Sequence, residues 1–435
     1  MGHVDDGVVR VQRKIAVVGT GYVGLTTGAC LAAIGHHVVC ADIDAGKVSR
    51  LRAGQVDILE PGLAELVRRG LDAGRLEFVV GAPAAIHTDT EVLFLCVPTP
   101  MGADGSADLR AVESVLREVG DLLPEDCAVA TKSTVPVGTA DRLSRMVNAP
   151  IVANPEFLRE GSAVDDFLHP DRIVVGSSDR PAARRVGALY EPLQAPTLIL
   201  DAASAEMVKY AANCFLAVKL SYVNAIAQLC DRVGADVVAV TEGMGYDPRI
   251  GRSFLKPGPG WGGSCLPKDA NALVHVAESV GLEFPLLRSA IEQNARQQAD
   301  VLDRVRQACD GTIRGARIGL LGLAFKAGTN DLRDSPAVRI ADALVAEGAE
   351  VTAHDPAISG ELSGIRLVDD PYEAVKGAVV VIVLTEWPEF RTLDWTRVAE
   401  LMDGFTVLDT RNLLDGDPLT RAGLTWRGMG RPVTS

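Results

Sequence analysis

The sequence contains no apolar run long enough to cross a bilayer. The longest unbroken hydrophobic stretch is Ala378–Leu384, whereas a membrane-spanning helix needs about 20 such residues. Met1–Gln12 is acidic and lacks the apolar core of a secretory signal peptide. We therefore expect a flexible start to the chain at 1–12 and a cytoplasmic protein that does not bind a membrane.

Paired or clustered cysteines are also absent. The eight cysteines are scattered, with no CxxC pair and no Cys/His spacing typical of a zinc site. Most lie in apolar runs, as Cys96 does within Val92–Val97. This pattern is typical of reduced, buried thiols in an intracellular protein. We expect neither a disulfide framework nor a metal site.

Positive charge is in short supply. The chain has 43 Lys and Arg against 57 Asp and Glu, a net charge of −14 and a pI of about 5.0. Nucleic acid is therefore not expected as a partner. An anionic small molecule still fits wherever cations gather locally. The 435 residues, 47% of them hydrophobic, are enough for about three globular domains.

The first third of the chain shows a dinucleotide-binding pattern. An apolar strand at Lys14–Val18 runs into the glycine turn Gly19–Gly24, and an apolar helix follows at Leu25–Ile34. The next strand, His37–Ala41, ends at Asp42. Glycines at these positions allow a pyrophosphate to approach the helix start, and the acid binds the ribose hydroxyls. A carboxylate would repel a 2′-phosphate, so NAD is favoured over NADP.

Polar loops follow several later strands of this first domain. We expect these strands at Leu76–Val80, Val92–Val97, Cys127–Lys132 and Pro150–Ala153. Ligands bind at the carboxyl ends of parallel strands, so loops 97–100 and 133–138 should face the nicotinamide. Thr99 and Thr134 can equally be turn or cap residues. The loop at 154–160 carries two carboxylates, for which a solvated charge is the usual alternative.

A long helix follows the first domain. Ala202–Arg232 has no proline or glycine, and apolar residues recur at helical spacing. About thirty residues at 1.5 Å each span about 45 Å, so we expect this helix to bridge domains or form a subunit interface. Lys209 and Asn213 share one face. Whether Lys209 serves a site or only extends to solvent is open from the sequence.

The stretch WGGSCLPKD at 261–269 has the features of a reactive site. Its two glycines allow close approach to a ligand, and Pro267 suits the first turn of the helix that follows. Cys265 would then lie at the positive end of that helix, beside Lys268, and both features favour the thiolate. Asp269 shares its helical face. The alternative is a buried cysteine that only fills space.

The opening pattern returns near residue 317. The expected elements are strands at Arg317–Leu321, Glu350–Ala353, Ala378–Thr385 and Thr406–Leu408, with a helix at Ser335–Glu347. The turn after the first strand lacks the full glycine fingerprint and offers Lys326 and Arg333, which Arg411 can join. Such cations suit a nucleotide diphosphate better than a second dinucleotide.

We therefore predict an α/β chain of two doubly wound, Rossmann-like domains joined by a central helical domain with one long helix. The NAD-binding domain is expected at 13–200, the central domain with the cysteine loop at 201–311, and a nucleotide-binding domain at 312–435.

Together, these motifs resemble the UDP-glucose 6-dehydrogenases within the UDP-glucose/GDP-mannose dehydrogenase family, over about residues 14–415. The motifs are GTGYVG at 19–24, CVPTP at 96–100, KSTVPVGT at 132–139, NPEFLREG at 154–161, EMVKYAANCFLAVK at 206–219, RIGRSFLKPGPGWGGSCLPKD at 249–269 and FKAGTNDLRDSP at 325–336. The resemblance implies a four-electron oxidation of a sugar C6 alcohol to a carboxylate with two NAD. A departure is Trp261, where many relatives carry Phe.

The resemblance also implies roles for individual residues. Its catalytic group comprises Cys265 as nucleophile, Lys209 and Asn213 at the reacting oxygen with Asp269 as their partner, Glu156 as hydrolytic base and Thr134 to place water. NAD would contact Gly19, Thr20, Gly21, Tyr22, Val23, Gly24, Asp42, Lys47, Val97, Pro98, Thr99, Ser133, Thr134, Glu160, Lys268 and Arg333. The nucleotide sugar would contact Glu156, Phe157, Leu158, Arg159, Lys209, Asn213, Arg249, Phe254, Leu255, Lys256, Gly260, Trp261, Gly262, Phe325, Lys326 and Arg411.

Alternatives remain at the level of substrate. UDP-glucose is the default substrate from the resemblance, and TDP-glucose or GDP-mannose would undergo the same chemistry. A two-electron hydroxy-acid dehydrogenase would need neither Cys265 nor residues 312–415, and a non-catalytic NAD sensor would need no nucleophile. The resemblance further implies a homodimer or larger assembly in which Arg249 reaches a neighbouring subunit's site.

Overall fold

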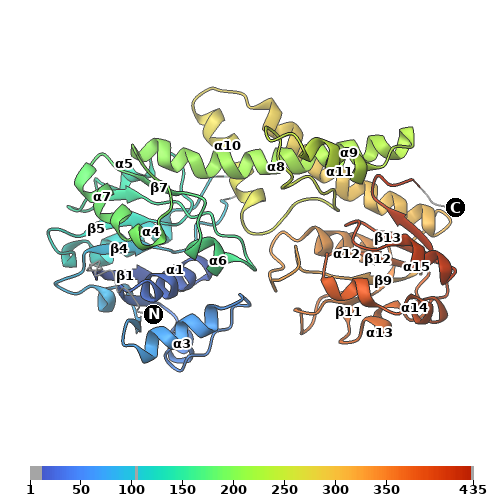
Figure 1. Cartoon of the computed structure of the whole chain (residues 1–435), viewed down its shortest axis with the longest axis horizontal. Coiled ribbons are helices and arrows are strands. Elements are labelled where there is room, and N and C mark those ends of the chain that lie inside the picture. The colour runs from blue at the N-terminus through green and yellow to red at the C-terminus, as the bar shows by residue number, and fades with distance from the viewer. Residues whose placement is uncertain (1–11, 103–105, 433–435) are drawn as a thin grey trace, which may run out of the picture. The chain divides into compact units, whose positions relative to one another are not determined.

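A computed structural model of the chain describes residues 12–102 and 106–432 (Figure 1). Apart from Gln12, the segment predicted to be flexible therefore lies outside the described residues. The chain divides into two compact units, Met1–Ala211 and Ala212–Ser435. The division falls inside one continuous helix, α8 (Ala202–Val233). Each unit is built around its own sheet.

Unit 1 is organised by an eight-stranded sheet in the order β3-β2-β1-β4-β5-β6-β7-β8. All pairs are parallel except β6 with β7. The strands are β1 (Lys14–Val18), β2 (His37–Asp42), β3 (Leu76–Val80), β4 (Val92–Leu95), β5 (Ala128–Thr131), β6 (Ile151–Ala153), β7 (Ile173–Gly176) and β8 (Thr197–Leu200). Most inner strands are apolar on both sides because helices cover both faces of the sheet.

Short connections return the chain from each strand to the next through helices. These are α1 (Tyr22–Ala33), α2 (Ala45–Arg52), α3 (Leu63–Asp72), α4 (Arg110–Val119), α5 (Thr139–Leu143), α6 (Ala163–Leu168) and α7 (Arg180–Ala188), with 3-10 turns η1 (Ala82–Ala85), η2 (Gly120–Leu122) and η3 (Glu191–Leu193). The order reverses between β1 and β4. This switch point is where open α/β sheets bind ligands.

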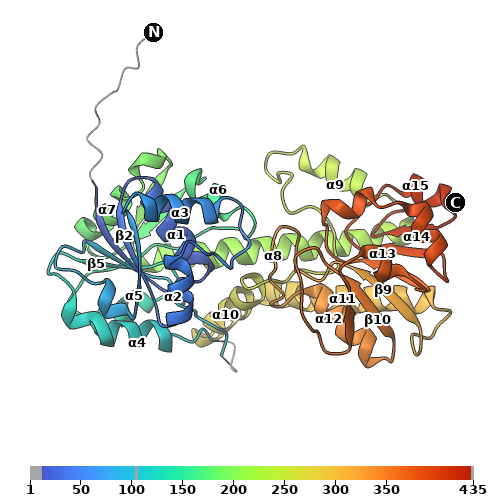
Figure 2. The same cartoon turned by 90° about the horizontal axis from the view of Figure 1, so that it is seen from below.

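The long helix confirms the expectation from its sequence. Without glycine or proline, α8 continues over 32 residues, and it is unbroken in both views (Figures 1 and 2). It begins next to the end of β8 in unit 1 and ends in unit 2. Residues on opposite ends of this helix can therefore belong to different units while keeping a fixed helical register.

Unit 2 combines helices with a six-stranded sheet in the order β11-β10-β9-β12-β13-β14, all parallel. Its strands are β9 (Arg317–Leu321), β10 (Glu350–His354), β11 (Ile365–Leu367), β12 (Val380–Val383), β13 (Thr406–Asp409) and β14 (Thr425–Gly428). Its helices are α9 (Val237–Gly245), α10 (Leu266–Ser279), α11 (Pro285–Ala308), α12 (Pro336–Ala346), α13 (Pro371–Val375), η4 (Pro388–Thr392), α14 (Trp395–Leu401) and α15 (Gly416–Arg421).

The predicted α/β class, with two Rossmann-like sheets and a helical region between them in the chain, is confirmed. Element ends differ slightly from expectation. The first helix begins at Tyr22 rather than Leu25, directly after its N-cap residue Gly21, so the second half of the glycine motif already belongs to the helix. The strand expected at Val92–Val97 ends at Leu95, because the chain turns there towards the switch point.

Candidate active site

The glycine turn of unit 1 is shaped for close approach to a ligand. Gly19 has φ +94°, and a side chain there would meet the main chain of Cys96. A Cβ on Gly24 would lie 1.8 Å from the Gly19 carbonyl oxygen, whereas a Cβ on Gly21 would meet nothing within 4 Å. Two glycines are therefore required by the fold. The third leaves open space at the N-terminus of α1, which fits a pyrophosphate.

Asp42 lies at the end of β2, as predicted. Its Oδ2 accepts hydrogen bonds from the Thr20 N–H at 3.0 Å and the Thr20 hydroxyl at 2.5 Å, and Lys47 Nζ lies 3.3 Å away. Burial raises the pKa of Asp42, but the hydrogen bonds from Thr20 and Asp44, together with the charge of Lys47, outweigh it and the pKa is lowered. A charged carboxylate suits the ribose hydroxyls of NAD.

The two loops predicted to face the nicotinamide are bonded to each other. The Ser133 hydroxyl donates to the Val97 carbonyl at 2.6 Å, and the Thr99 hydroxyl donates to the Thr134 carbonyl at 2.8 Å. Glu206 of α8 accepts the N–H groups of Gly138 and Ala140 at 2.7 and 2.8 Å. Thr99 and Ser133 thus fix the loops at the switch point, and α8 supports the second loop from behind.

Lys209 and Glu156 form a buried ion pair in unit 1. Their relative exposures are 3% and 7%, and Lys209 Nζ lies 2.9 Å from Glu156 Oε1. The other carboxylate oxygen accepts the Leu158 N–H at 2.6 Å. Lys209 Nζ also lies 5.5 Å from the centre of the Phe157 ring. Lys209 therefore does not extend to solvent, and Glu156 is not a solvated loop charge.

Cys265 lies directly before α10 in unit 2, with Pro267 in the first turn. Asp269 is fully buried, and it accepts hydrogen bonds from Lys268 Nζ at 2.5 Å and Asn213 Nδ2 at 2.6 Å. Burial raises the pKa of the neighbouring Cys214 to about 12. Cys265 is only partly buried and is the N-cap residue of α10, a position that favours the thiolate form of a cysteine.

The segment before the cysteine is held by polar side chains that the sequence analysis did not single out. Asn294 of α11 accepts the Trp261 N–H at 2.7 Å and donates to its carbonyl at 2.9 Å. Ser221 accepts the Trp261 indole N–H at 2.8 Å. Asn224 and Gln297 bond the main chain of Gly258.

Ser221 and Asn224 on α8, and Asn294 and Gln297 on α11, are therefore two pairs of polar residues spaced i, i+3 on buried helix faces. That spacing of polar residues, in helices otherwise expected to pack, is the signal that could have identified them. The predicted substrate residues around them include the buried Leu255 and Phe254, whose φ of +61° is a strained value for a non-glycine residue.

The turn after β9 differs from the glycine turn of unit 1. Asp355, at the end of β10, is 3% exposed. Its Oδ2 accepts the N–H groups of Leu323 and Ala324 at 2.7 and 2.9 Å and the indole N–H of Trp387 at 3.1 Å. This acid is therefore committed to its own turn and is not presented to a ribose. Unit 2 does not repeat the dinucleotide site of unit 1.

The cations predicted near that turn are only partly brought together. Arg411 donates to the Phe325 carbonyl at 3.0 Å and lies 3.1 Å from Glu386, and Lys326 Nζ lies 5.7 Å from the centre of the Phe325 ring. Three further predicted arginines are exposed and pair with nearby carboxylates. These pairs are Arg333 with Asp331, Arg159 with Asp166 and Arg249 with Asp247.

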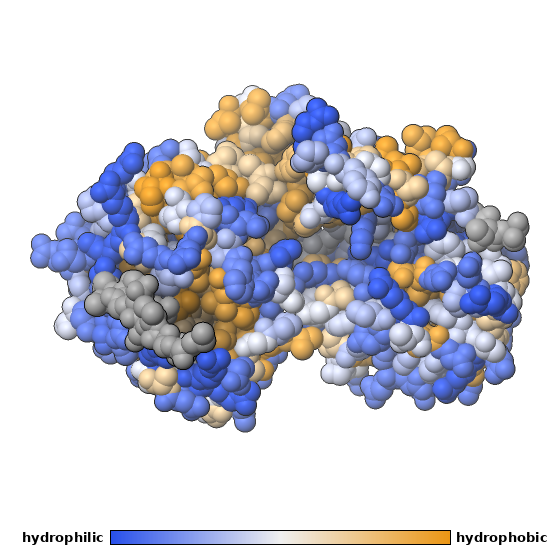
Figure 3. Space-filling view, viewed as in Figure 1, coloured by the Kyte–Doolittle hydropathy of each residue, from blue (hydrophilic) through white to orange (hydrophobic). Residues whose placement is uncertain are grey.

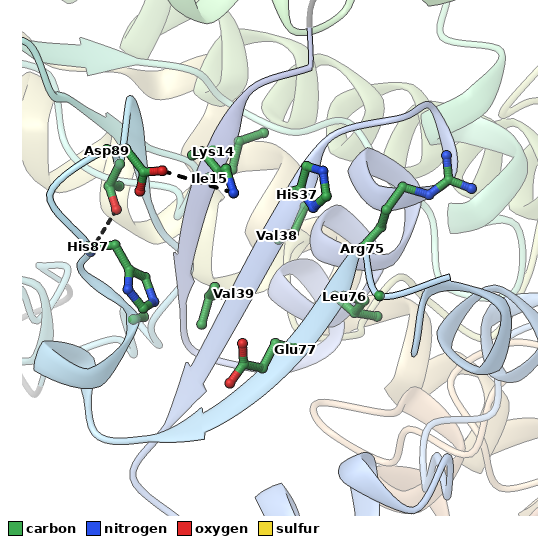
Figure 4. A pocket seen from close by; sticks show the side chains of 13 residues that line it. Lys14, Ile15, His37, Val38, Val39, Arg75, Leu76, Glu77, His87 and Asp89 are labelled. Carbon is green, nitrogen blue, oxygen red and sulfur yellow. Dashed lines mark hydrogen bonds and ion pairs between the residues drawn. The ribbon is translucent and has the colours of Figure 1, made fainter. Parts of the chain in front are cut away.

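A cavity of 310 Å³ in unit 1 lies at the other end of the sheet (Figure 4). Lys14 and His37 begin β1 and β2, and Arg75 precedes β3. Glu77 and Asp89 balance this charge, with Lys14 4.0 Å from Asp89. The cavity is at the amino ends of the strands, whereas the glycine turn is at their carboxyl ends. It is not the coenzyme site.

Neither a metal cluster nor a membrane span is found where the structure is described. Within residues 12–102 and 106–432, no three His, Cys, Asp or Glu side chains are grouped to hold a metal ion. No helix in the same part of the chain is both long and apolar enough to cross a membrane.

Three family models match the chain in order. They are the NAD binding domain (residues 13–194), the central domain (203–296) and the UDP binding domain (319–416) of the UDP-glucose/GDP-mannose dehydrogenase family. The UDP-glucose 6-dehydrogenase TuaD of Bacillus subtilis is 42% identical, covering 97% of this chain and 94% of that protein. The UDP-glucose 6-dehydrogenase of Rhizobium meliloti is also 42% identical, over 96% of this chain and all of its own.

Solved structures agree with these matches. A UDP-glucose dehydrogenase from Pyrobaculum islandicum superimposes with a TM-score of 0.89 at 37% identity, covering 99% of this chain and 100% of that one. A UDP-D-ManNAc dehydrogenase from Pyrococcus horikoshii gives a TM-score of 0.86 at 28% identity, over 96% and 99% of the two chains. With its glycine turn, Asp42 and the ordered domains, this chain belongs to the UDP-glucose/GDP-mannose dehydrogenase family of NAD-dependent dehydrogenases.

Proposed function

We propose that the protein oxidises the C6 alcohol of UDP-glucose to the carboxylate of UDP-glucuronate, a four-electron reaction that uses two NAD. NAD, when bound, supplies the electron acceptor for both oxidations. The observation that carries the proposal is Cys265 at the start of α10, half-buried beside the cluster of Asp269, Lys268 and Asn213. Relatives of about 42% identity bear the corresponding name.

Cys265 makes the second oxidation chemically accessible. An aldehyde does not give up its C–H hydrogen as hydride until a nucleophile has added to its carbonyl. The Cys265 thiolate adds to the carbonyl carbon, and protonation of the resulting oxyanion gives a thiohemiacetal. Loss of the C6 hydrogen as hydride, which carries the two electrons to the acceptor, and of the hydroxyl proton to a base converts this adduct to a thioester. Water then attacks the thioester, which releases the acid and restores the thiol.

Lys209 and Asn213 supply positive charge and a hydrogen-bond donor to the reacting oxygen. They are spaced i, i+4 on α8, so one helical face carries both. A cationic ammonium and an amide N–H stabilise the oxyanion that develops in each step. Asp269 fixes Asn213 through its 2.6 Å hydrogen bond, so the amide keeps its orientation.

Glu156 is our candidate for the base that activates water. Its oxygens accept hydrogen bonds from Lys209 and Leu158. When Lys209 turns to the substrate oxygen, the oxygen of Glu156 that it leaves becomes available to water. Thr134, whose carbonyl accepts the Thr99 hydroxyl, helps to place that water.

We assign nucleotide-sugar binding to the segment Phe254–Gly262 and to the C-terminal part of the chain. Phe325, Lys326 and Arg411 are close neighbours at the turn after β9, and the matching family model for 319–416 is a UDP binding domain. In this division, residues 13–200 bind NAD, 201–311 carry the cysteine loop and 312–435 hold the nucleotide.

Product stoichiometry tests the reaction class. We expect two NADH for each UDP-glucose consumed, whereas a two-electron dehydrogenase would give one. The assay is run side by side with UDP-galactose, TDP-glucose and GDP-mannose. If another nucleotide sugar gives a higher kcat/KM, that sugar and not UDP-glucose is the substrate. The four-electron chemistry is unaffected by this outcome.

Two cysteine variants test the covalent step. Cys265→Ser should retain nucleotide-sugar binding and lose full turnover by a factor of about 10³ or more, the scale of losing a covalent nucleophile. Cys309→Ser is the matched control, because that thiol is also partly buried in unit 2 but lies at the end of α11. Mass spectrometry of quenched wild-type enzyme should show an acyl adduct on Cys265. Wild-type rates in Cys265→Ser would refute the thioester route.

We also propose that the protein acts as a homodimer through α8. Phe215, Tyr222, Leu229 and Val233 are 52–67% exposed and recur at intervals of seven, seven and four residues, so they share one helical stripe. Exposed hydrophobic residues interrupt an otherwise largely hydrophilic surface (Figure 3). An apolar stripe along one long helix suits the same stripe of a second copy.

A further inference from the structure

Glu60 connects the coenzyme turn to the loop that contains Glu156. Glu60 lies just before α3 and is 6% exposed. Its Oε2 accepts the hydroxyl of Tyr22, the first residue of α1, and the Gly161 N–H at 2.7 Å. The Gly161 N–H also lies 2.9 Å from the Tyr22 hydroxyl oxygen. Three segments distant in the sequence therefore meet at one carboxylate.

The loop 156–161 is held by three acidic side chains in succession. Glu156 accepts the N–H of Leu158, Asp166 accepts that of Arg159 at 2.8 Å, and Glu60 accepts that of Gly161. The first two contacts are local in sequence. The third reaches across 101 residues and is the one that also includes the coenzyme turn. A displacement of Tyr22 would therefore be transmitted to this loop.

The Tyr22 hydroxyl has a defined direction in this arrangement. Burial, followed by the hydrogen bond and charge of Glu60, raises the pKa of Tyr22, so the phenol remains protonated and donates to the carboxylate. Tyr22 follows Gly21, where the open space at the helix start fits the pyrophosphate. Tyr22 thus belongs to the coenzyme turn through its main chain and to the loop through its hydroxyl.

We propose that Glu60 is a positioning residue that, through Tyr22 and Gly161, makes the order of the 156–161 loop depend on whether NAD occupies the glycine turn. The reaction exchanges one coenzyme for another while the sugar remains attached, so a loop that senses coenzyme occupancy would place Glu156 only when the second NAD has bound. This consequence rests on the proposed function, whereas the link itself concerns only NAD binding.

Amide hydrogen exchange measures the effect of NAD on the 156–161 loop in the absence of turnover. In the wild type, saturating NAD should slow amide exchange in peptides covering 156–164. In Tyr22→Phe, which removes one oxygen atom, and in Glu60→Gln, NAD held above its measured Kd should no longer slow exchange there. Glu65→Gln is the matched control, because Glu65 is exposed on α3 and pairs with Arg68; it should behave as wild type. Thermal unfolding checks that each variant is folded.

Steady-state kinetics provide a second readout. Each single variant should lower kcat/KM for NAD by roughly tenfold, within the usual range of coupling between sites. The double variant Tyr22→Phe/Glu60→Gln should be no worse than either single variant, because both break the same connection. Multiplicative losses, or equal NAD protection of 156–164 in every variant, would overturn the proposal. Failure of the Cys265 chemistry would leave the exchange result unchanged.

Discussion

Lys132, at the end of β5, is a lysine enclosed by aromatic rings. It is 4% exposed, and its Nζ lies 5.5–5.9 Å from the ring centres of Phe94, Phe167 and Tyr190. Its hydrogen bonds go to Asn154 Oδ1 and the Tyr190 hydroxyl, both at 3.3 Å. Burial lowers the pKa of Lys132 to about 8, although the charges of Cys96 and Glu156 oppose this. The charged form is therefore less favourable here than in the unfolded chain.

This environment predicts a pH-dependent stability. Between pH 8 and the ordinary value of 10.5, the unfolded chain binds more protons at Lys132 than the folded chain, so the free energy of unfolding rises with pH. The penalty is complete below pH 8 and is on the order of 3 kcal/mol, since one pKa unit corresponds to about 1.4 kcal/mol. Lys132→Met should therefore stabilise the protein at pH 7, and the gain should shrink by pH 10.

Urea unfolding at both pH values measures this difference. Lys14→Met, at an exposed lysine of the same unit, is the control and should change stability by less than about 0.5 kcal/mol. A Lys132→Met effect of the same size at pH 7 and pH 10 would show that the charge is not its cause.

At the residue scale, the sequence identifies chemical types better than partners. The position of Cys265 and Asp269 at the start of α10 could be predicted, because it depends on local features, a helix start and i, i+4 spacing. The pairing of Lys209 with Glu156 could not be predicted, because it joins positions 53 residues apart. The i, i+3 spacing of Asn294 with Gln297 and of Ser221 with Asn224 could have marked them as polar residues of interest. Their bonds to the 256–263 segment could not be predicted, because they depend on packing.

At the element scale, the glycine turn contains glycines that the fold requires and one glycine that only ligand binding requires. Gly24→Ala would place a methyl group 1.8 Å from the Gly19 oxygen, so β1 or α1 must shift, and we expect a loss of about 1–3 kcal/mol in stability. Gly21→Ala would meet no protein atom within 4 Å, and its φ of −66° suits alanine. It should keep its melting temperature and bind NAD at least about tenfold more weakly.

Melting curves and NAD titrations of the two variants check this contrast. Normal NAD affinity in Gly21→Ala would place the pyrophosphate elsewhere. Unchanged stability in Gly24→Ala would show that the helix can move away from the turn at little cost.

Elements with a strong local pattern were predicted almost to their ends. The strands β1, β3 and β9 match the expected residues, and α8 ends one residue beyond expectation, since each is a continuous apolar or glycine-free run with clear boundaries. The ends of β4 and β12 were placed too far out. Apolar residues continue beyond the last paired residues, Leu95 and Val383, and hydrophobicity alone does not show where pairing stops.

At the scale of the whole molecule, two similar sheets differ in what the acid at the end of the second strand contacts. Both carry an acid at the end of the second strand. The two acids are alike in the sequence, although the turn of unit 2 lacks the full glycine fingerprint. Asp42 is partly exposed beside Lys47. Asp355 is buried, and one of its oxygens accepts hydrogen bonds from two main-chain N–H groups and the Trp387 indole. The difference depends on whether the turn leaves its donors for a ligand or satisfies them internally.

The proposed dimer gives the last prediction. Tyr222→Lys places a charge in the middle of the exposed stripe of α8 and should convert a species of twice the 45.9 kDa chain mass to a monomer in light scattering. Phe405→Lys, at another exposed aromatic residue of unit 2, should not. Insertion of an unpaired charge in an apolar interface is strongly unfavourable. If the Tyr222→Lys protein keeps the mass of the wild type, α8 does not form the interface.

Complementation then tests whether the dimer shares its sites. Arg249 is exposed and pairs with Asp247 through a local contact, which leaves it able to reach a second copy. Subunits with Cys265→Ser and subunits with Arg249→Ala should each be nearly inactive. A mixed dimer would contain one complete site only if Arg249 acts across the interface, and activity should then return to about half per mixed dimer. If Arg249 acts within its own subunit, mixing restores nothing, because every site lacks one of the two residues.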